Sequence, residues 1–282
     1  MTIAAGVLHR DGILLCADTQ QESGAMKVYG PKVGSFPCPG GRVAFAFAGN
    51  VAFASSAVSK CSYRMESAPS GDFFRKLEET LDKEYRRVVF AHPSYPDWTL
   101  AYSLILAIWS GSHGVKLFVT HENTLREVST GHQCIGMGQE LGHYLAGLSF
   151  APNMREQDAL LLAAYMLARV KDHVPGCGGP SQFLALRNDG TVSPIASVTL
   201  EHIERNAKPY EFLARSLLFA AADGELSDEQ FEEQLNAFIQ YLRTARTSWR
   251  ESESNRKALV DALMQLRATA QSSPSKSSSD QT

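Results

Sequence analysis

The first 18 residues constrain the fold of this chain most strongly, because they hold two short apolar runs on either side of a polar turn. The runs are residues 3–8 and 12–17, and the turn is His9-Arg10-Asp11 followed by Gly12. Short apolar runs joined by such a turn are typical of a hairpin of two buried strands. Pairing in a sheet also fixes a chain end that would otherwise fray. We therefore expect Asp18, at the end of the second strand, to lie beside Thr2.

Thr2, Asp18 and Lys32 form a candidate catalytic group. If Met1 is removed, Thr2 carries a hydroxyl and a free α-amine, so that nucleophile and general base belong to one residue. Lys32 is expected to begin a third strand after a glycine-containing loop. A lysine ammonium beside Thr2 lowers the pKa of both the hydroxyl and the amine, and an aspartate keeps that lysine charged and oriented.

Several motifs carry a resemblance to a known family. They are Thr2-Ile3, the glycine-to-aspartate strand 12–18, Met26-Lys27, Lys32-Val33, Phe47-Ala48-Gly49, Gly136-Met137-Gly138 and Cys177-Gly178-Gly179. With these motifs, which lie between residues 2 and 198, the chain resembles the proteasome β-subunit family of N-terminal nucleophile hydrolases, and most of all its bacterial ring-peptidase branch.

The resemblance implies a role for each matching residue. Thr2 is the expected nucleophile, Asp18 and Lys32 are its activating pair, and the Gly49 N–H is the oxyanion donor. The implied activity is that of a threonine-type endopeptidase that cleaves peptides or unfolded protein inside a homo-oligomeric ring. An ATPase unfoldase is a partner that the resemblance leaves open.

Three positions depart from the family pattern and keep two alternatives open. Met137 stands where the family has a serine that binds the terminal amine, and methionine is at best a weak acceptor. Val174 and Cys177 stand where the family often has aspartate and serine, and Asp172 can substitute only if its loop is rearranged. The alternatives are a catalytically silent ring or scaffold subunit and an amidohydrolase of small substrates.

The order of the remaining elements indicates an α+β chain with antiparallel sheets. Strands are predicted at 42–48, 98–109, 115–121, 125–129, 183–187 and 191–198, and helices at 51–63, 71–91, 141–148 and 157–171. Two sheets packed face to face between two helix layers, a four-layer αββα sandwich, is the form that the resemblance implies. We assign this domain to residues 2–200.

The chain after Lys208 changes to purely helical patterns. Helices are predicted at 210–221, 227–249 and 255–270, so that residues 208–270 form a helical extension outside the usual family core. Its simplest role is that of a structural clamp, and a gate or a dock for a partner is the functional alternative. The Ser-rich segment 271–282 is predicted to be a disordered tail.

Composition excludes several other classes of function. A net charge of −3 gives no electrostatic reason to expect binding of nucleic acid or an anionic membrane. The five cysteines show no zinc-binding spacing, and we predict neither a metal nor a cofactor. No apolar stretch approaches the ~20 residues of a membrane helix. We expect a soluble, cytoplasmic protein with reduced cysteines.

Overall fold

A computed structural model describes residues 2–23, 26–66 and 73–272. Contacts divide the chain into two compact units, Met1–Glu204 and Arg205–Thr282. None of the described helices is long and apolar enough to cross a membrane. The tail expected at 271–282 stays a prediction, because residues 273–282 lie outside the described part of the chain.

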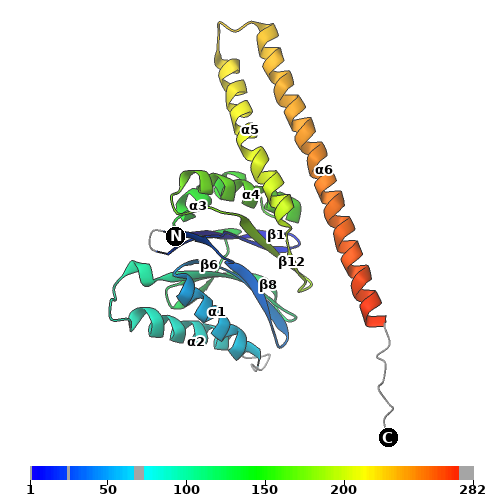
Figure 1. Ribbon diagram of the computed structural model, residues 1–282. Coiled ribbons are helices and arrows are strands. Elements are labelled where there is room, and N and C mark those ends of the chain that lie inside the picture. The colour runs from blue at the N-terminus through cyan, green and yellow to red at the C-terminus, as the bar shows by residue number, and fades with distance from the viewer. Residues whose placement is uncertain (1, 24–25, 67–72, 273–282) are drawn as a thin grey trace. The chain divides into compact units, whose positions relative to one another are not determined.

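The first unit consists of four layers, in which two antiparallel sheets lie face to face between two helix pairs (Figure 1). One sheet has the order β10-β1-β2-β11-β12, with strands β1 Ile3–His9, β2 Gly12–Asp18, β10 His132–Gly136, β11 Ser181–Arg187 and β12 Val192–Pro194. The other has the order β5-β6-β7-β8-β9, with strands β5 Val33–Cys38, β6 Gly41–Gly49, β7 Tyr102–Ser110, β8 Gly114–His121 and β9 Thr124–Glu127. The four-layer αββα sandwich predicted above is confirmed.

The helices cover the outer faces of the two sheets (Figure 1). Those on the second sheet are α1 Val51–Glu66 and α2 Phe73–Tyr85, which continues as the π-helical turn η2 Arg86–Phe90. Those on the first sheet are α3 Gln139–Ser149 and α4 Glu156–His173. The predicted start of the second helix, at residue 71, lies outside the described residues. A 3₁₀ turn, η3 Trp98–Leu100, replaces the first residues of the strand predicted at 98–109.

The hairpin of β1 and β2 is the centre of the first sheet. His9 pairs with Gly12, so the turn between the strands is only two residues long. Both strands are almost completely buried, because α4 packs on one face of the hairpin and the second sheet on the other. Strand β10 adds to β1 and β11 adds to β2, with Ser181 opposite Asp18. This register brings Thr2 and Asp18 together at the open end of the β1–β2 hairpin.

Small side chains let the two sheets approach closely. The buried residues between them are Ala4, Ile13, Leu15, Ala17, Ala44, Ala46, Ala48, Ile105, Ala107, Leu117, Val119, Val128, Ile135, Leu184 and Leu186. Gly6 of β1 faces this layer, and a methyl group on it would lie only 2.8 Å from Leu117 Cδ1 and 2.9 Å from Ile105 Cγ2. The absence of a side chain at Gly6 therefore allows the two sheets to pack closely at this point of β1.

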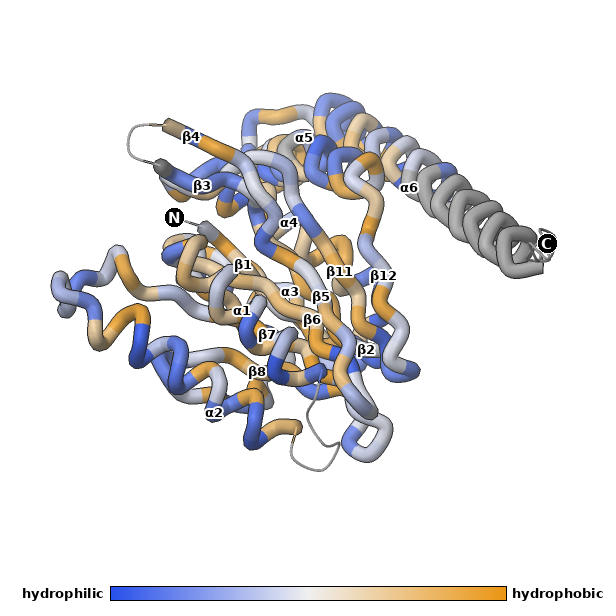
Figure 2. Tube along the Cα trace, turned by 60° about the horizontal axis from the view of Figure 1, so that its bottom comes forward, coloured by the Kyte–Doolittle hydropathy of each residue, from blue (hydrophilic) through white to orange (hydrophobic). Residues whose placement is uncertain are grey.

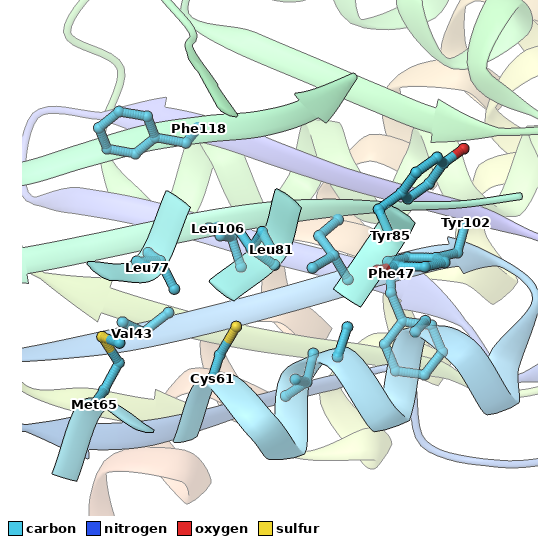
Figure 3. Close-up of a cluster of buried hydrophobic side chains, with 14 of the residues drawn as sticks. Val43, Phe47, Cys61, Met65, Leu77, Leu81, Tyr85, Tyr102, Leu106 and Phe118 are labelled. Atoms are coloured by element: carbon cyan, nitrogen blue, oxygen red, sulfur yellow. The ribbon is translucent and has the colours of Figure 1, made fainter. Parts of the chain in front are cut away.

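A second core lies between the second sheet and helices α1 and α2 (Figure 3). Phe47 and Tyr102 contribute from β6 and β7, and Leu77 and Leu81 from α2. Burial of side chains of this size stabilises the fold by about 1.5–3 kcal/mol each. This core holds β6 in place, and β6 ends beside the candidate site.

The structure contains strands that the sequence did not predict. Strands β3 Gln20–Ser23 and β4 Met26–Tyr29 form a two-stranded ribbon where only a loop was expected. Figure 2 shows this ribbon extending from the same edge of the unit as the start of β1. The four residues of β3 are all polar and the four residues of β4 are all exposed, so the ribbon has no apolar face of the kind that marks a half-buried strand. Strand β10 was also missed, because its five residues are too short and too mixed to show a period.

The C-terminal elements differ from the prediction at two points. Strand β12 ends at Pro194, and α5 Ser197–Ala222 begins where a strand to 198 was expected. Proline has no N–H for a strand ladder, which explains the early end. Helix α6 Asp228–Ser272 is one helix rather than two, since its sequence contains neither glycine nor proline. Within the second unit, Tyr210 of α5 packs against Phe238 of α6 at 6.0 Å between ring centroids.

The tight contact at Gly6 generates a test of the sheet packing. We expect Gly6→Val to lower the free energy of unfolding by about 1–3 kcal/mol, because the added methyl groups overpack the layer between the sheets. Gly147→Ala is the control, since Gly147 lies within α3 with nothing near its missing side chain. This change should instead stabilise by about 0.5–1 kcal/mol. Urea denaturation measures both, and equal effects would contradict the packing described here.

Candidate active site

The Asp18 carboxylate is the centre of the candidate site. Its Oδ1 accepts hydrogen bonds from Thr2 Oγ1 at 2.5 Å, Ile3 N at 3.2 Å and Lys32 Nζ at 2.9 Å. Its Oδ2 accepts one from Gly178 N at 2.8 Å. The side chain is completely buried, so these donors replace the water that an exposed carboxylate would bind. The donors come from β1, from the residue before β5 and from the turn before β11.

Lys32 is buried as deeply as its partner, with only 1% of the side chain exposed. Its Nζ also donates to the carbonyl of Gln20, its backbone N donates to Gln182 Oε1 at 2.9 Å, and its carbonyl accepts from Phe47 N at 3.1 Å. Burial lowers the pKa of Lys32 from its ordinary value, and the charge and hydrogen bond of Asp18 oppose that effect. The Lys32 ammonium group is thus held by the Asp18 carboxylate and the Gln20 carbonyl.

Thr2 is placed by its backbone as well as by Asp18. The Thr2 carbonyl accepts a hydrogen bond from Gly138 N at 3.4 Å. Gly136 has a φ of +91°, and a methyl group there would lie 2.4 Å from the Thr2 carbonyl and 2.9 Å from Ala48 Cβ. Only glycine fits this position, because the backbone passes between β1 and the end of β6.

Gly49, the expected oxyanion donor, ends β6 one residue after Ala48. Its φ of +93° and its contact with the Ala101 carbonyl also require glycine. In the described part of the chain no hydrogen bond joins it to the other predicted residues. The structure therefore brings Thr2, Asp18 and Lys32 into direct contact, and it places Gly49 on the neighbouring strand end.

Met137 and Asp172 do not supply the serine and aspartate side chains that the resemblance led us to expect at the site. Met137 is 45% exposed at the turn between β10 and α3. Asp172 lies within α4, which continues unbroken to His173, and its carboxylate pairs with Arg169 at 3.0 Å. The rearrangement that would carry Asp172 into the site is therefore absent from the described α4.

Cys177 lies beside the buried pair as a neutral thiol. Burial raises its pKa to about 12, and the negative charge of Asp18 adds to this effect. The nearby His173 ring contacts Arg169 at 3.0 Å rather than the thiol. Because the thiolate is the nucleophilic form, Cys177 is a packing residue here.

Sequence reasoning missed the backbone groups that complete the site. The Gly178 N–H binds Asp18, and the Gln20 carbonyl binds Lys32. Gln20 N also donates to the Gly178 carbonyl at 3.0 Å, which ties β3 to the turn before β11. The paired glycines at 178 and 179 were the available signal, but a glycine pair does not indicate where its amides point.

Solved structures share this fold. Anbu (ancestral beta-subunit) from Yersinia bercovieri is 16% identical with a TM-score of 0.64, and the match covers 80% of this chain and 99% of that one. An Anbu (Gly-1) mutant from Hyphomicrobium sp. strain MC1 is 16% identical with a TM-score of 0.63, covering 81% and 100%. The fold is that of Anbu. The Anbu complex from Pseudomonas aeruginosa, described as a helical assembly, is 14% identical with a TM-score of 0.63, covering 76% and 96%.

These matches correct the resemblance drawn from the sequence. No protein-family model matches the chain, and no curated protein matches it. The assignment to the proteasome β-subunit family, nearest its bacterial ring-peptidase branch, was wrong, because the matching structures are Anbu proteins. The motifs used for that assignment are strand ends and glycine turns, which the backbone geometry of the fold requires. At this level of identity the likeness to Anbu shows the fold alone.

The burial of Asp18 and Lys32 generates a thermodynamic test. Lys32→Met should lower the free energy of unfolding by about 3–5 kcal/mol, because it leaves a buried carboxylate without its counterion. Asp18→Asn should be costly for the converse reason. The double variant should lose clearly less than the sum of the single losses, because it leaves no unpaired charge. Denaturant unfolding of the four proteins measures this coupling, and additive losses would show that the pair is not coupled.

Proposed function

We propose that this protein is a threonine-type peptide hydrolase with Thr2 as nucleophile, acting within a homo-oligomer of Anbu-like subunits. The observation that supports it is the set of hydrogen bonds in which Thr2 Oγ1 and Lys32 Nζ share one oxygen of the buried Asp18. A hydroxyl, a carboxylate and a lysine so arranged match the activated-nucleophile pattern. The reaction needs cleavage of the peptide bond before Thr2, which frees the α-amine.

The proposed reaction follows from the positions of these groups. The free Thr2 amine accepts the hydroxyl proton as the oxygen attacks a substrate carbonyl, and an acyl-enzyme forms. The positive charge of Lys32 favours the neutral amine and the developing alkoxide, and Asp18 fixes Lys32. The leaving amine takes the proton, and water then hydrolyses the ester. Gly49 N–H is our candidate for stabilising the tetrahedral oxyanion.

Oligomerisation, substrate size and location belong to the same proposal. The helical assembly described for the Pseudomonas aeruginosa Anbu complex supports self-association, and an enclosed site would admit peptides or unfolded chains. An ATPase unfoldase is then a partner that could deliver them. The five cysteines are free thiols, which suits the cytoplasm.

A catalytically silent subunit is the second candidate, and the altered positions favour it. Met137 has no hydrogen-bonding hydroxyl to bind the Thr2 amine, and Asp172 lies on α4, where it pairs with Arg169. Intact mass separates the two candidates, because a chain that keeps Met1 has no free Thr2 amine. A protein that begins at Thr2 and assembles, yet cleaves neither casein, fluorogenic peptides nor acyl-amino acids, would be a scaffold.

The nucleophile assignment is tested directly at Thr2. We expect Thr2→Ala to abolish hydrolysis, because it removes the attacking oxygen and leaves the hairpin unchanged. Thr2→Ser keeps the hydroxyl and should retain activity. Fluorogenic-peptide assays measure the rates, and native mass spectrometry checks that the assembly is unaltered. Wild-type rates in Thr2→Ala protein would refute the assignment.

The role of Lys32 is tested by comparing two lysine-to-alanine variants and by measuring how kcat/KM depends on pH. Lys32→Ala should reduce kcat by about 100-fold or more, the lower range for a lost acid–base group. Lys27→Ala should leave kcat nearly unchanged, because Lys27 lies on the exposed strand β4. Since burial lowers the pKa of Lys32, kcat/KM should fall on the alkaline side at a pH below 10.5. A larger loss in Lys27→Ala, or a profile flat to pH 10.5, would exclude Lys32 from this role.

A further inference from the structure

A second ion pair, partly buried, contacts the segment that follows Gly178. Lys171 of α4 and Glu204 of α5 are joined at 2.6 Å, and their side chains are only 13% and 18% exposed. Lys171 Nζ also donates to the Gly179 carbonyl at 3.2 Å and to Ser181 Oγ at 3.0 Å. Ser181 Oγ in turn donates to Glu204 Oε1 at 2.5 Å. The two charged groups thus bind both ends of the segment 179–181.

This segment continues directly into the turn that binds Asp18. Gly178 N donates to Asp18 Oδ2, and the neighbouring Gly179 carbonyl is the group that Lys171 holds. Thr19 Oγ1 donates to the Pro180 carbonyl at 2.8 Å from the other side. The turn is therefore fixed from the strand side by β2 and β3 and from the helix side by Lys171 and Glu204. Movement of Gly179 would change the direction of the Gly178 N–H.

The geometry points to Lys171 and Glu204 as positioning residues for Asp18, acting through the Gly178–Gly179 turn. This inference rests on the proposed function, in which Asp18 orients Lys32 and the Thr2 hydroxyl. Gly179 has a φ of +74°, a conformation that a non-glycine residue rarely adopts, and a side chain there would lie 2.5 Å from Tyr29 Cδ1 and 2.6 Å from Thr19 Oγ1. Because Glu204 lies in the first turns of α5 and ends the first unit, the start of α5 contributes to the geometry of the catalytic carboxylate.

A matched ion pair on the same strand separates positioning from general stability. Arg187, at the far end of β11, binds Glu156 at 2.8 Å, with side chains 30% and 14% exposed. It lies opposite Gly12 and so at the other end of β2 from Asp18. Loss of this pair should destabilise the unit to a similar degree without reaching the site. Arg187→Met and Glu156→Gln are therefore the controls for Lys171→Met and Glu204→Gln.

The experiment combines hydrogen exchange with kinetics on the full-length protein. We expect Lys171→Met to speed exchange of the Gly178 N–H about tenfold, since the turn loses its helix-side support. With fluorogenic peptides, kcat should fall about tenfold with KM unchanged, because the alignment of Thr2 changes and substrate binding does not. Glu204→Gln, which keeps its shape, should give smaller changes of the same kind. Lys171→Arg, which keeps the charge, should restore most of both.

Each outcome decides the inference. If Lys171→Met fails to fold, Glu204→Gln and Lys171→Arg carry the comparison. The positioning role would be overturned if Lys171→Met changed the exchange rate of the Gly178 N–H and kcat no more than Arg187→Met does. If wild-type protein shows no Thr2-dependent hydrolysis, the proposed function fails, and the exchange rate of Gly178 still decides whether Lys171 and Glu204 hold the turn.

Discussion

The buried Asp18–Lys32 ion pair is the interaction on which the rest of the first unit depends. A lone charge in such an environment would cost several kcal/mol, so both groups need partners that the folded chain supplies. Asp18 is satisfied only when β1, the residue before β5 and the turn before β11 have all come together. Residues from both sheets donate hydrogen bonds to the Asp18 carboxylate, and the Asp18–Lys32 pair therefore helps to specify how the two sheets pack against each other.

The close packing around this ion pair also explains why certain positions of the chain must be glycine. Gly136 lets the backbone pass between Thr2 and Ala48, and Gly6 lets the sheets approach. Gly178 and Gly179 turn an amide toward Asp18. Each glycine stands where backbone or a neighbouring side chain must come within contact distance of the site or of the strands that carry it.

The sequence predicted the hairpin and the trio, because each leaves a local signal such as an apolar run, a turn or a strand-end charge, whereas the four-layer form was implied only by the resemblance. It missed the ribbon β3–β4 and the edge strand β10, since their pairing is decided by distant partners and not by a period in their own residues. It also missed the Gly178 amide, because a hydrogen bond between residues 160 positions apart leaves no local pattern. The motifs that suggested the proteasome β-subunit family encode backbone geometry shared across the fold, so they led to the wrong assignment.

Backbone groups supply part of the hydrogen bonding around Asp18 and Lys32. Cys177 is a thiol that burial keeps neutral, and the second oxygen of Asp18 accepts a hydrogen bond from the Gly178 amide. An amide donor is as good as a hydroxyl only while its turn is held in one conformation, since a peptide plane cannot rotate as a hydroxyl does. The turn is held by Lys171, Ser181 and Glu204. A site built on backbone donors thereby comes to require the first turns of α5, which belong to the first unit and supply Glu204.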